Sequence, residues 1–155
     1  MNIFILNYDF DKNAQLLKDK HILKMIVEST QILCNCFDKN LVPYKRTHYN
    51  HPCCKWARES VYNFNWLKKY ALSLCQEYTY RYNKIHKCQN VIESLNNPNI
   101  TNFEMTPFIQ CMPDIYKNRS TIKAYTNYYI KEKLERATWK NRPIPKRFVN
   151  YLETT

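Results

Sequence analysis

Apolar residues recur at helical spacing in three long stretches of the chain, which are separated by polar or proline-containing segments. The first stretch predicts a helix over residues 9–36, with Asp9 or Asp11 as its N-cap. The second stretch begins at Pro52, a residue that suits the first position of a helix. Because its apolar pattern then continues without a break, it predicts a long central helix over residues 52–82.

The rest of the chain is less regular. The third stretch predicts a helix over residues 120–134, whose first residue is a capping serine, and a weak helix is expected at 91–95. Residues 38–49 and 101–118 contain prolines and are interpreted as loops. Residues 1–8, with the sequence MNIFILNY, predict a short extended segment that is buried because it is almost entirely apolar.

The chain has 155 residues and contains no glycine, which narrows the class of fold. Glycine-rich phosphate loops, dinucleotide-binding fingerprints and glycine hairpin turns all depend on a missing side chain, so these are excluded. A hydrophobic content of 45% argues against disorder, and the length suits one domain with a single core. We therefore predict an all-α, compact single domain over residues 1–155. It has about three main helices, an extended N-terminal segment and an extended basic tail at 138–155.

The charge of the chain indicates what it binds. There are 24 Lys and Arg against 13 Asp and Glu, a formal net charge of +11, which is typical of proteins that bind nucleic acid or another acidic partner. No stretch reaches the roughly 20 apolar residues of a membrane span, and the apolar N-terminus is too short for a signal peptide. We expect no membrane association and an intracellular location: cytoplasm, nucleus, viral factory or virion. The seven cysteines are an odd number and are interpreted as reduced thiols.

A histidine and a carboxylate share one face of the first predicted helix. Glu28 follows His21 by seven residues, which is two helical turns, and Lys24 lies between them. With Lys20 close by, this arrangement suits acid/base work on a polyanion. The alternative is an ordinary solvated face, with a Lys24–Glu28 pair worth about 0.2–0.5 kcal/mol. The pattern alone leaves both interpretations open.

The segment that enters the second predicted helix contains two histidines and two neighbouring cysteines. His51 precedes Pro52 at a helix N-terminus, where backbone N–H groups attract phosphate. These residue types also bind zinc, and His86 and Cys88 follow the helix, but a helix at about 1.5 Å per residue would hold the two groups tens of ångströms apart. We therefore predict no metal and no cofactor. The further basic residues expected to contact nucleic acid are His48, His51, Lys55, Arg58, Lys140, Arg142, Lys146 and Arg147.

In order and spacing, these features resemble the pyrimidine-dimer DNA glycosylase/AP lyase family of the phage endonuclease V type. The resemblance covers residues 1–85 and extends more weakly beyond them. The residues that carry it are, in chain order, His21, Glu28, His51-Pro52, Trp66-Leu67, Glu77, Arg81, Tyr128-Tyr129 and Trp139.

The resemblance implies a DNA-repair enzyme that acts on damaged duplex DNA, at a pyrimidine dimer or an abasic site. In this family an N-terminal α-amine attacks C1′ of the sugar, forms a Schiff base and cleaves the strand by β-elimination. The amine here would belong to Met1, or to Asn2 if the initiator is removed, and α-amines are partly unprotonated at neutral pH. Glu28 would stabilise the positive sugar and move protons, and His21 would lie on the phosphate side.

The chain also departs from the family pattern. Arginines that the family has near the N-terminus and the catalytic glutamate are replaced by Ile3, Val27 and Gln31. Because lysines elsewhere in the site lack the bidentate fork of arginine, a damaged base other than a dimer is a further candidate substrate. The main alternative is a non-catalytic basic protein of viral type that binds nucleic acid and tolerates Glu28→Gln. A zinc-supported nucleic-acid-binding module is the second alternative.

Overall fold

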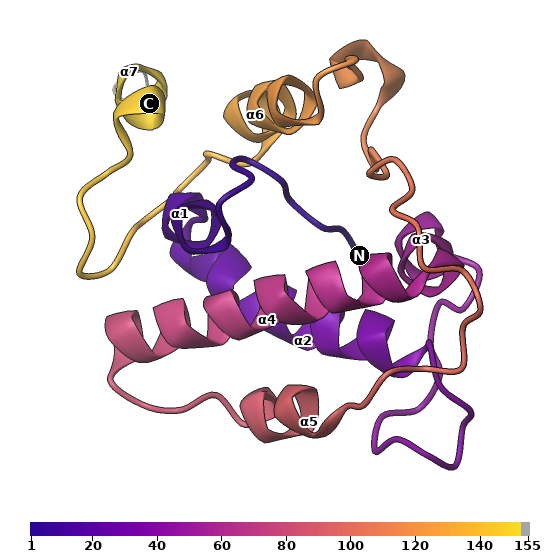
Figure 1. Ribbon diagram of the computed structural model, residues 1–155. Helices are drawn as coiled ribbons and strands as arrows, with labels where there is room; N and C mark the ends of the chain where they lie inside the picture. The colour runs from indigo at the N-terminus through magenta and orange to yellow at the C-terminus, as the bar shows by residue number, and fades with distance from the viewer. Residues whose placement is uncertain (153–155) are drawn as a thin grey trace.

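The longest helix, α4 (Val61–Tyr82), lies at the centre of the structure, a computed structural model that describes residues 1–152 (Figure 1). Within that range the chain forms seven α-helices and no strand, so the prediction of an all-α, compact single domain is confirmed. The prediction of about three main helices was too low. The other elements are α1 (Phe10–Leu16), α2 (Asp19–Cys34), α3 (Pro52–Glu59), α5 (Cys88–Ser94), the 3₁₀ turn η1 (Asp114–Tyr116), α6 (Thr121–Glu132) and α7 (Lys146–Leu152).

Helix α4 packs against α1, α2, α3 and α5, and α5 also packs against α2. Figure 1 shows the N-terminal segment running between α4 and α6. Tyr70 from α4 and Tyr125 and Tyr129 from α6 contribute fully buried rings to the core around this segment. None of the helices in the described range is long and apolar enough to span a membrane.

The N-terminal segment is buried as predicted, and side chains satisfy its backbone in place of a neighbouring strand. The amide of Asn13 does most of this: its Oδ1 accepts from the backbone N–H of Leu6 at 2.6 Å, and its Nδ2 donates to the carbonyl of Phe4 at 2.9 Å. The hydroxyl of Tyr70 donates to the same carbonyl at 3.1 Å. Since buried backbone groups need partners, these bonds allow a single extended segment to lie inside a helical protein.

The single helix predicted over residues 9–36 is wrong, because the chain leaves the helical conformation at Leu17 and Lys18. Leu17 is fully buried, so the apolar pattern continues through the break and conceals it. The buried guanidinium of Arg81 donates to the carbonyl of Leu17 at 2.8 Å and also contacts the carbonyls of Ala14 and Gln15. Arg81 thereby supplies donors to carbonyls at the end of α1, where the helix itself provides few; the carbonyl of Ala14 also accepts from the N–H of Leu17 at 3.2 Å.

The predicted helix over residues 52–82 is also two helices. Pro52 begins α3 as expected, but Ser60 is extended and its hydroxyl caps α4 by accepting from the N–H of Asn63 at 3.0 Å. The predicted end at Tyr82 is confirmed, since Asn83 adopts a left-handed cap. The predicted cap at Ser120 is also confirmed, because its hydroxyl accepts from the N–H of Lys123.

The prediction of an extended basic tail at 138–155 is wrong for residues 146–152, which form α7. Phe148 is fully buried and stacks against Tyr129 and Trp139, so the burial of an aromatic side chain stabilises this last helix. Two tail arginines bind the body of the protein: Arg142 pairs with Glu77, and Arg147 donates to the carbonyl of Leu6 at 2.8 Å. Residues 153–155 of the predicted tail lie outside the described residues.

Candidate active site

The structure brings the first two residues of the chain to the carboxylate of Glu28. The α-amine nitrogen of Met1 lies 3.8 Å from Oε2 of Glu28, and the backbone N–H of Asn2 donates to the same oxygen at 3.2 Å. The other carboxylate oxygen, Oε1, lies 3.7 Å from Nζ of Lys24, one helical turn earlier on α2. Only 13% of the Glu28 side chain is exposed, so this carboxylate is held between two cationic groups with little solvent around it.

The side chain of Asn2 fixes the position of the N-terminus. Its Nδ2 donates to the carbonyl of Cys111 at 2.8 Å, and its Oδ1 accepts from the hydroxyl of Tyr125 at 3.0 Å. The same Oδ1 accepts from the backbone N–H of Ile3. The side chain of Met1 is buried, with its sulfur 3.6 Å from that of Cys54. The amine is thus anchored from α3, α6 and the loop before η1.

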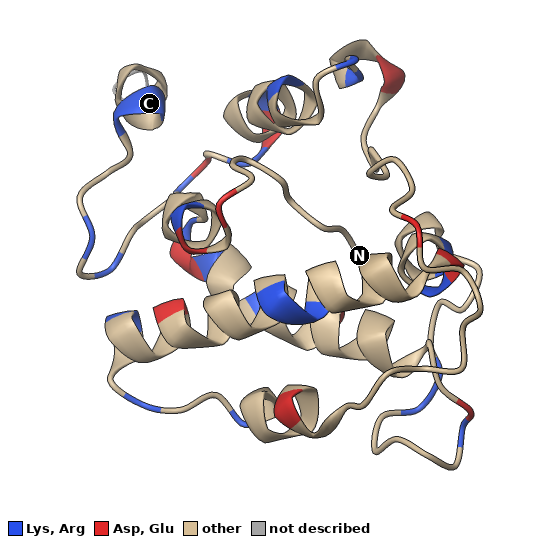
Figure 2. Cartoon of the chain, viewed as in Figure 1, with Lys and Arg blue, Asp and Glu red and all other residues tan. Residues whose placement is uncertain are grey.

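A cavity of about 120 Å³ opens at this amine, and a groove of about 430 Å³ continues from it. His21, Lys24 and Lys133 line both, so the two spaces are adjacent. Figure 2 shows that Lys and Arg are spread over most elements of the fold, and the groove is one place where several of them converge. The groove is lined by Lys18, Lys20, His21, Lys24, Glu132, Lys133, Glu135, Arg136 and Thr138.

His21 is a neutral, positioned imidazole at the wall between cavity and groove. Its ring stacks on Phe4, with centroids 4.6 Å apart and an interplanar angle of 13°, and its Nδ1 lies 2.8 Å from the hydroxyl of Tyr129. Burial, reinforced by the surrounding lysines, lowers the pKa of His21 to about 3. The ring is therefore uncharged at neutral pH. It can exchange hydrogen bonds with a substrate, but it adds no positive charge for phosphate.

The predicted residues at the start of the second helix lie in two environments. His51 lies close to the site: burial and then the N-terminal amine lower its pKa, whereas Glu28 raises it. Arg58 instead stacks over the ring of Tyr49, with its guanidinium carbon 3.8 Å from the ring centroid. His48 and Lys55 are exposed, and His48 has a left-handed φ of 50°.

The predicted tail residues do not line the cavity or the groove of the N-terminus. Lys140 lies over the ring of Tyr82, with its Nζ 5.2 Å from the centroid, and Lys146 is exposed. Both carboxylate oxygens of Glu77 accept from Arg142, at 3.1 and 2.9 Å, and this pairing raises the pKa of Arg142. Its guanidinium is therefore already occupied within the protein.

Sequence reasoning missed the contribution of the third predicted helix to the site. Lys133 follows Tyr129 by one helical turn: Lys133 lines the cavity and the groove, and the hydroxyl of Tyr129 is the hydrogen-bond partner of His21. The sequence does contain a tyrosine and a lysine at helical spacing, which would indicate a shared helix face, but nothing in it places that pair near His21. Arg136, just beyond α6, also lines the groove.

Comparison with known proteins links the matched part of the chain to a family. A family model described as pyrimidine dimer DNA glycosylase matches residues 1–90 of the 155 residues. The matched range includes the N-terminal segment, helices α1 to α4, and both His21 and Glu28. No curated protein and no solved structure matches the chain.

Proposed function

The chain belongs to the pyrimidine dimer DNA glycosylase family, and we propose that it is a DNA-repair glycosylase with AP lyase activity that attacks damaged duplex DNA through its N-terminal amine. The observation that carries the proposal is the position of Glu28 Oε2, 3.8 Å from the Met1 amine and 3.2 Å from the Asn2 nitrogen. Removal of the initiator would leave the amine of Asn2 beside the same oxygen, so either residue can supply the nucleophile.

The reaction begins when the unprotonated amine attacks C1′ of the damaged nucleotide. The base leaves with the electron pair of the glycosidic bond and takes up a proton. Opening of the sugar then gives an iminium, the Schiff base between C1′ and the amine. Loss of a proton from C2′ allows the 3′ phosphate to leave, which cleaves the strand. Glu28 is placed to stabilise the positive charge at C1′ and to move these protons.

The groove supports the proposal because it offers lysines where the DNA backbone would have to lie. Lys20, Lys24 and Lys133 line the approach to the amine, and each is a point charge that can contact a phosphate. Neutral His21 lines both the groove and the cavity of the amine, together with Lys24 and Lys133, and is a positioning group for the sugar or its phosphate. Access to C1′ requires an extruded nucleotide, a distortion of a few kcal/mol that damage lowers.

Strand cleavage of a duplex with one abasic site tests the assignment. In Glu28→Gln, or in protein acetylated at its N-terminus, we expect cleavage to fall by at least about 100-fold while DNA affinity stays unchanged. Glu93→Gln is the matched control, because Glu93 is an exposed glutamate on α5, outside the N-terminal cavity and groove. Full cleavage by Glu28→Gln would refute the mechanism. Duplex binding without cleavage of any damaged substrate would favour a non-catalytic DNA-binding protein.

A further inference from the structure

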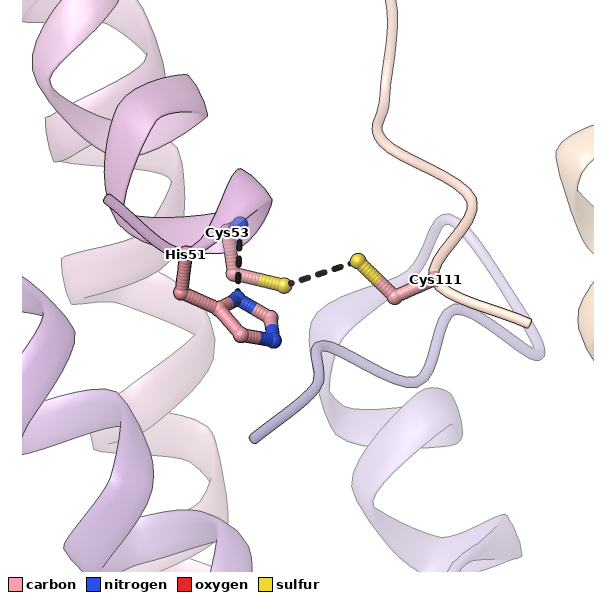
Figure 3. Close-up of side chains that lie close together, drawn as sticks. All are labelled: His51, Cys53 and Cys111. Carbon is pink, nitrogen blue, oxygen red and sulfur yellow. Dashed lines mark hydrogen bonds between the residues drawn. The ribbon is translucent and has the colours of Figure 1, made fainter. Parts of the chain in front are cut away.

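Three side chains that bind soft metals converge next to the N-terminus. His51 caps α3, Cys53 lies in the first turn of the same helix, and Cys111 comes from the loop before η1 (Figure 3). One ligand atom from each residue lies within 4.8 Å of the other two, and the sulfur atoms of Cys53 and Cys111 are 3.4 Å apart. Two segments far apart in the sequence therefore contribute to one cluster.

The composition of the cluster selects a class of ligand. Two thiols and one imidazole are the donor set of zinc sites, in which Zn²⁺ takes four ligands in tetrahedral geometry. Two thiolates would cancel the charge of the ion, so a bound zinc would leave the neighbouring N-terminal amine beside a neutral site. Cys53 is fully buried, while His51 and Cys111 are half-buried, so the cluster has an entry from solvent.

The hydrogen bonds of the cluster are compatible with replacement by a metal. Nδ1 of His51 accepts from the backbone N–H of Cys53 at 3.0 Å, and the thiols of Cys53 and Cys111 share a hydrogen bond. A neutral imidazole has one free lone pair, so binding through either ring nitrogen exchanges the helix-cap bond for a bond to the metal. The thiol–thiol hydrogen bond is weak and is exchanged for two zinc–thiolate bonds, with release of both protons.

We propose that His51, Cys53 and Cys111 form a zinc-binding site that fastens the loop before η1 to the start of α3, with the fourth coordination position open to solvent. A metal at this site would also affect the N-terminus. The carbonyl of Cys111 accepts from the side chain of Asn2, so a metal on Cys111 also fixes the loop that holds the N-terminus. The argument against zinc from helix length concerned His86 and Cys88, at the far end of the predicted helix. It does not apply to Cys111, because a later loop brings this residue next to the start of α3.

Cobalt titration of the untagged protein tests the site, after reduction with a phosphine and removal of metal by a chelator. We expect a thiolate-to-cobalt charge-transfer band with tetrahedral visible bands, saturating at one cobalt per chain and abolished by one equivalent of zinc. Zinc should also raise the Tm of the metal-free protein. Neither readout depends on DNA or on lyase activity, so the outcome is independent of the proposed reaction.

Three variants and one control assign the ligands. Cys53→Ala and Cys111→Ala should lose the charge-transfer band. His51→Asn keeps a helix-capping side chain but removes the imidazole, so its affinity should fall by at least about 10–100-fold with α3 intact by circular dichroism. Cys36→Ala, which removes another half-buried thiol, should bind like the original protein. No saturable band, or an unchanged band in both Cys53→Ala and Cys111→Ala, would overturn the proposal.

Discussion

Replacing Arg81 with methionine should destabilise the protein more than any other single change in its charged groups. The side chain is fully buried and joins α4 to both ends of the α1–α2 break. Methionine fills similar apolar volume but supplies none of the donors. The groups left behind are the carboxylates of Glu77 and Asp19 and the carbonyls of Ala14, Gln15 and Leu17.

The size of the loss in stability depends on which hydrogen-bond partners these groups keep. Glu77 keeps its pair with Arg142, and Asp19 keeps bonds from Thr138 and from the backbone of Lys140. The carbonyl of Leu17 is buried and loses the hydrogen bond that the guanidinium of Arg81 donates to it. Removing one member of a buried charge network costs about 3–5 kcal/mol. Against a typical total stability of about 5–15 kcal/mol, this is a large fraction.

Urea unfolding followed by tryptophan fluorescence measures this loss. With an m-value of about 2 kcal/mol/M, the midpoint of Arg81→Met should fall by about 2 M. Arg142→Met is the matched control, since Arg142 pairs with the same Glu77 but a quarter of its side chain is exposed, and such pairs contribute about 1 kcal/mol or less. If Arg81→Met shifts the midpoint no further than Arg142→Met, the role given to Arg81 in ending α1 is refuted.

Two further predictions concern the walls of the site. The pKa of His21 is about 3 in the folded protein and near 6.5 in the unfolded chain. As the pH falls below 6.5, only the unfolded state therefore takes up this proton. Protonation of His21 in the unfolded state should reduce the free energy of unfolding by about 2 kcal/mol between pH 7 and pH 5. Urea unfolding at both pH values should show that His21→Gln removes this difference, and an unchanged pH dependence would contradict the neutral ring. Lys20→Ala and Lys133→Ala should each lower the slope of log affinity for duplex DNA against log salt by about 1, whereas Lys84→Ala, outside the groove, should leave it unchanged. Equal slopes in all three variants would place the DNA elsewhere.

Local chemistry in the sequence predicted the helical class and several helix ends. Pro52, Ser120 and the end at Tyr82 were correct because each depends on one residue and its neighbours. The break at Leu17 was missed because its carbonyl is satisfied by Arg81, more than sixty residues later. The break at Ser60 was missed because the apolar pattern continues across it. Hydrophobic periodicity cannot distinguish a bent pair of helices from one long helix.

The candidate site was also predictable only where it depends on local sequence. The shared face of His21 and Glu28 follows from helical periodicity, but their approach to the N-terminus depends on Asn13 and Tyr70, which bind the extended segment. The sequence pattern also could not show that the ring of His21 is uncharged, since this depends on burial against Phe4. Likewise, the pairing of Cys53 with Cys111 is set by the path of a loop and by no local pattern.

The most direct test of the proposed amine chemistry is borohydride trapping of the untagged protein on a duplex that carries one abasic site. Reduction of a Schiff base would leave a stable amine bond between C1′ and the nucleophile. We expect a covalent complex whose peptide map places the DNA on the α-amine of Met1 or Asn2, with none formed on an undamaged duplex. A complex mapped to a lysine of the groove, or no complex although the duplex is bound, would contradict the account.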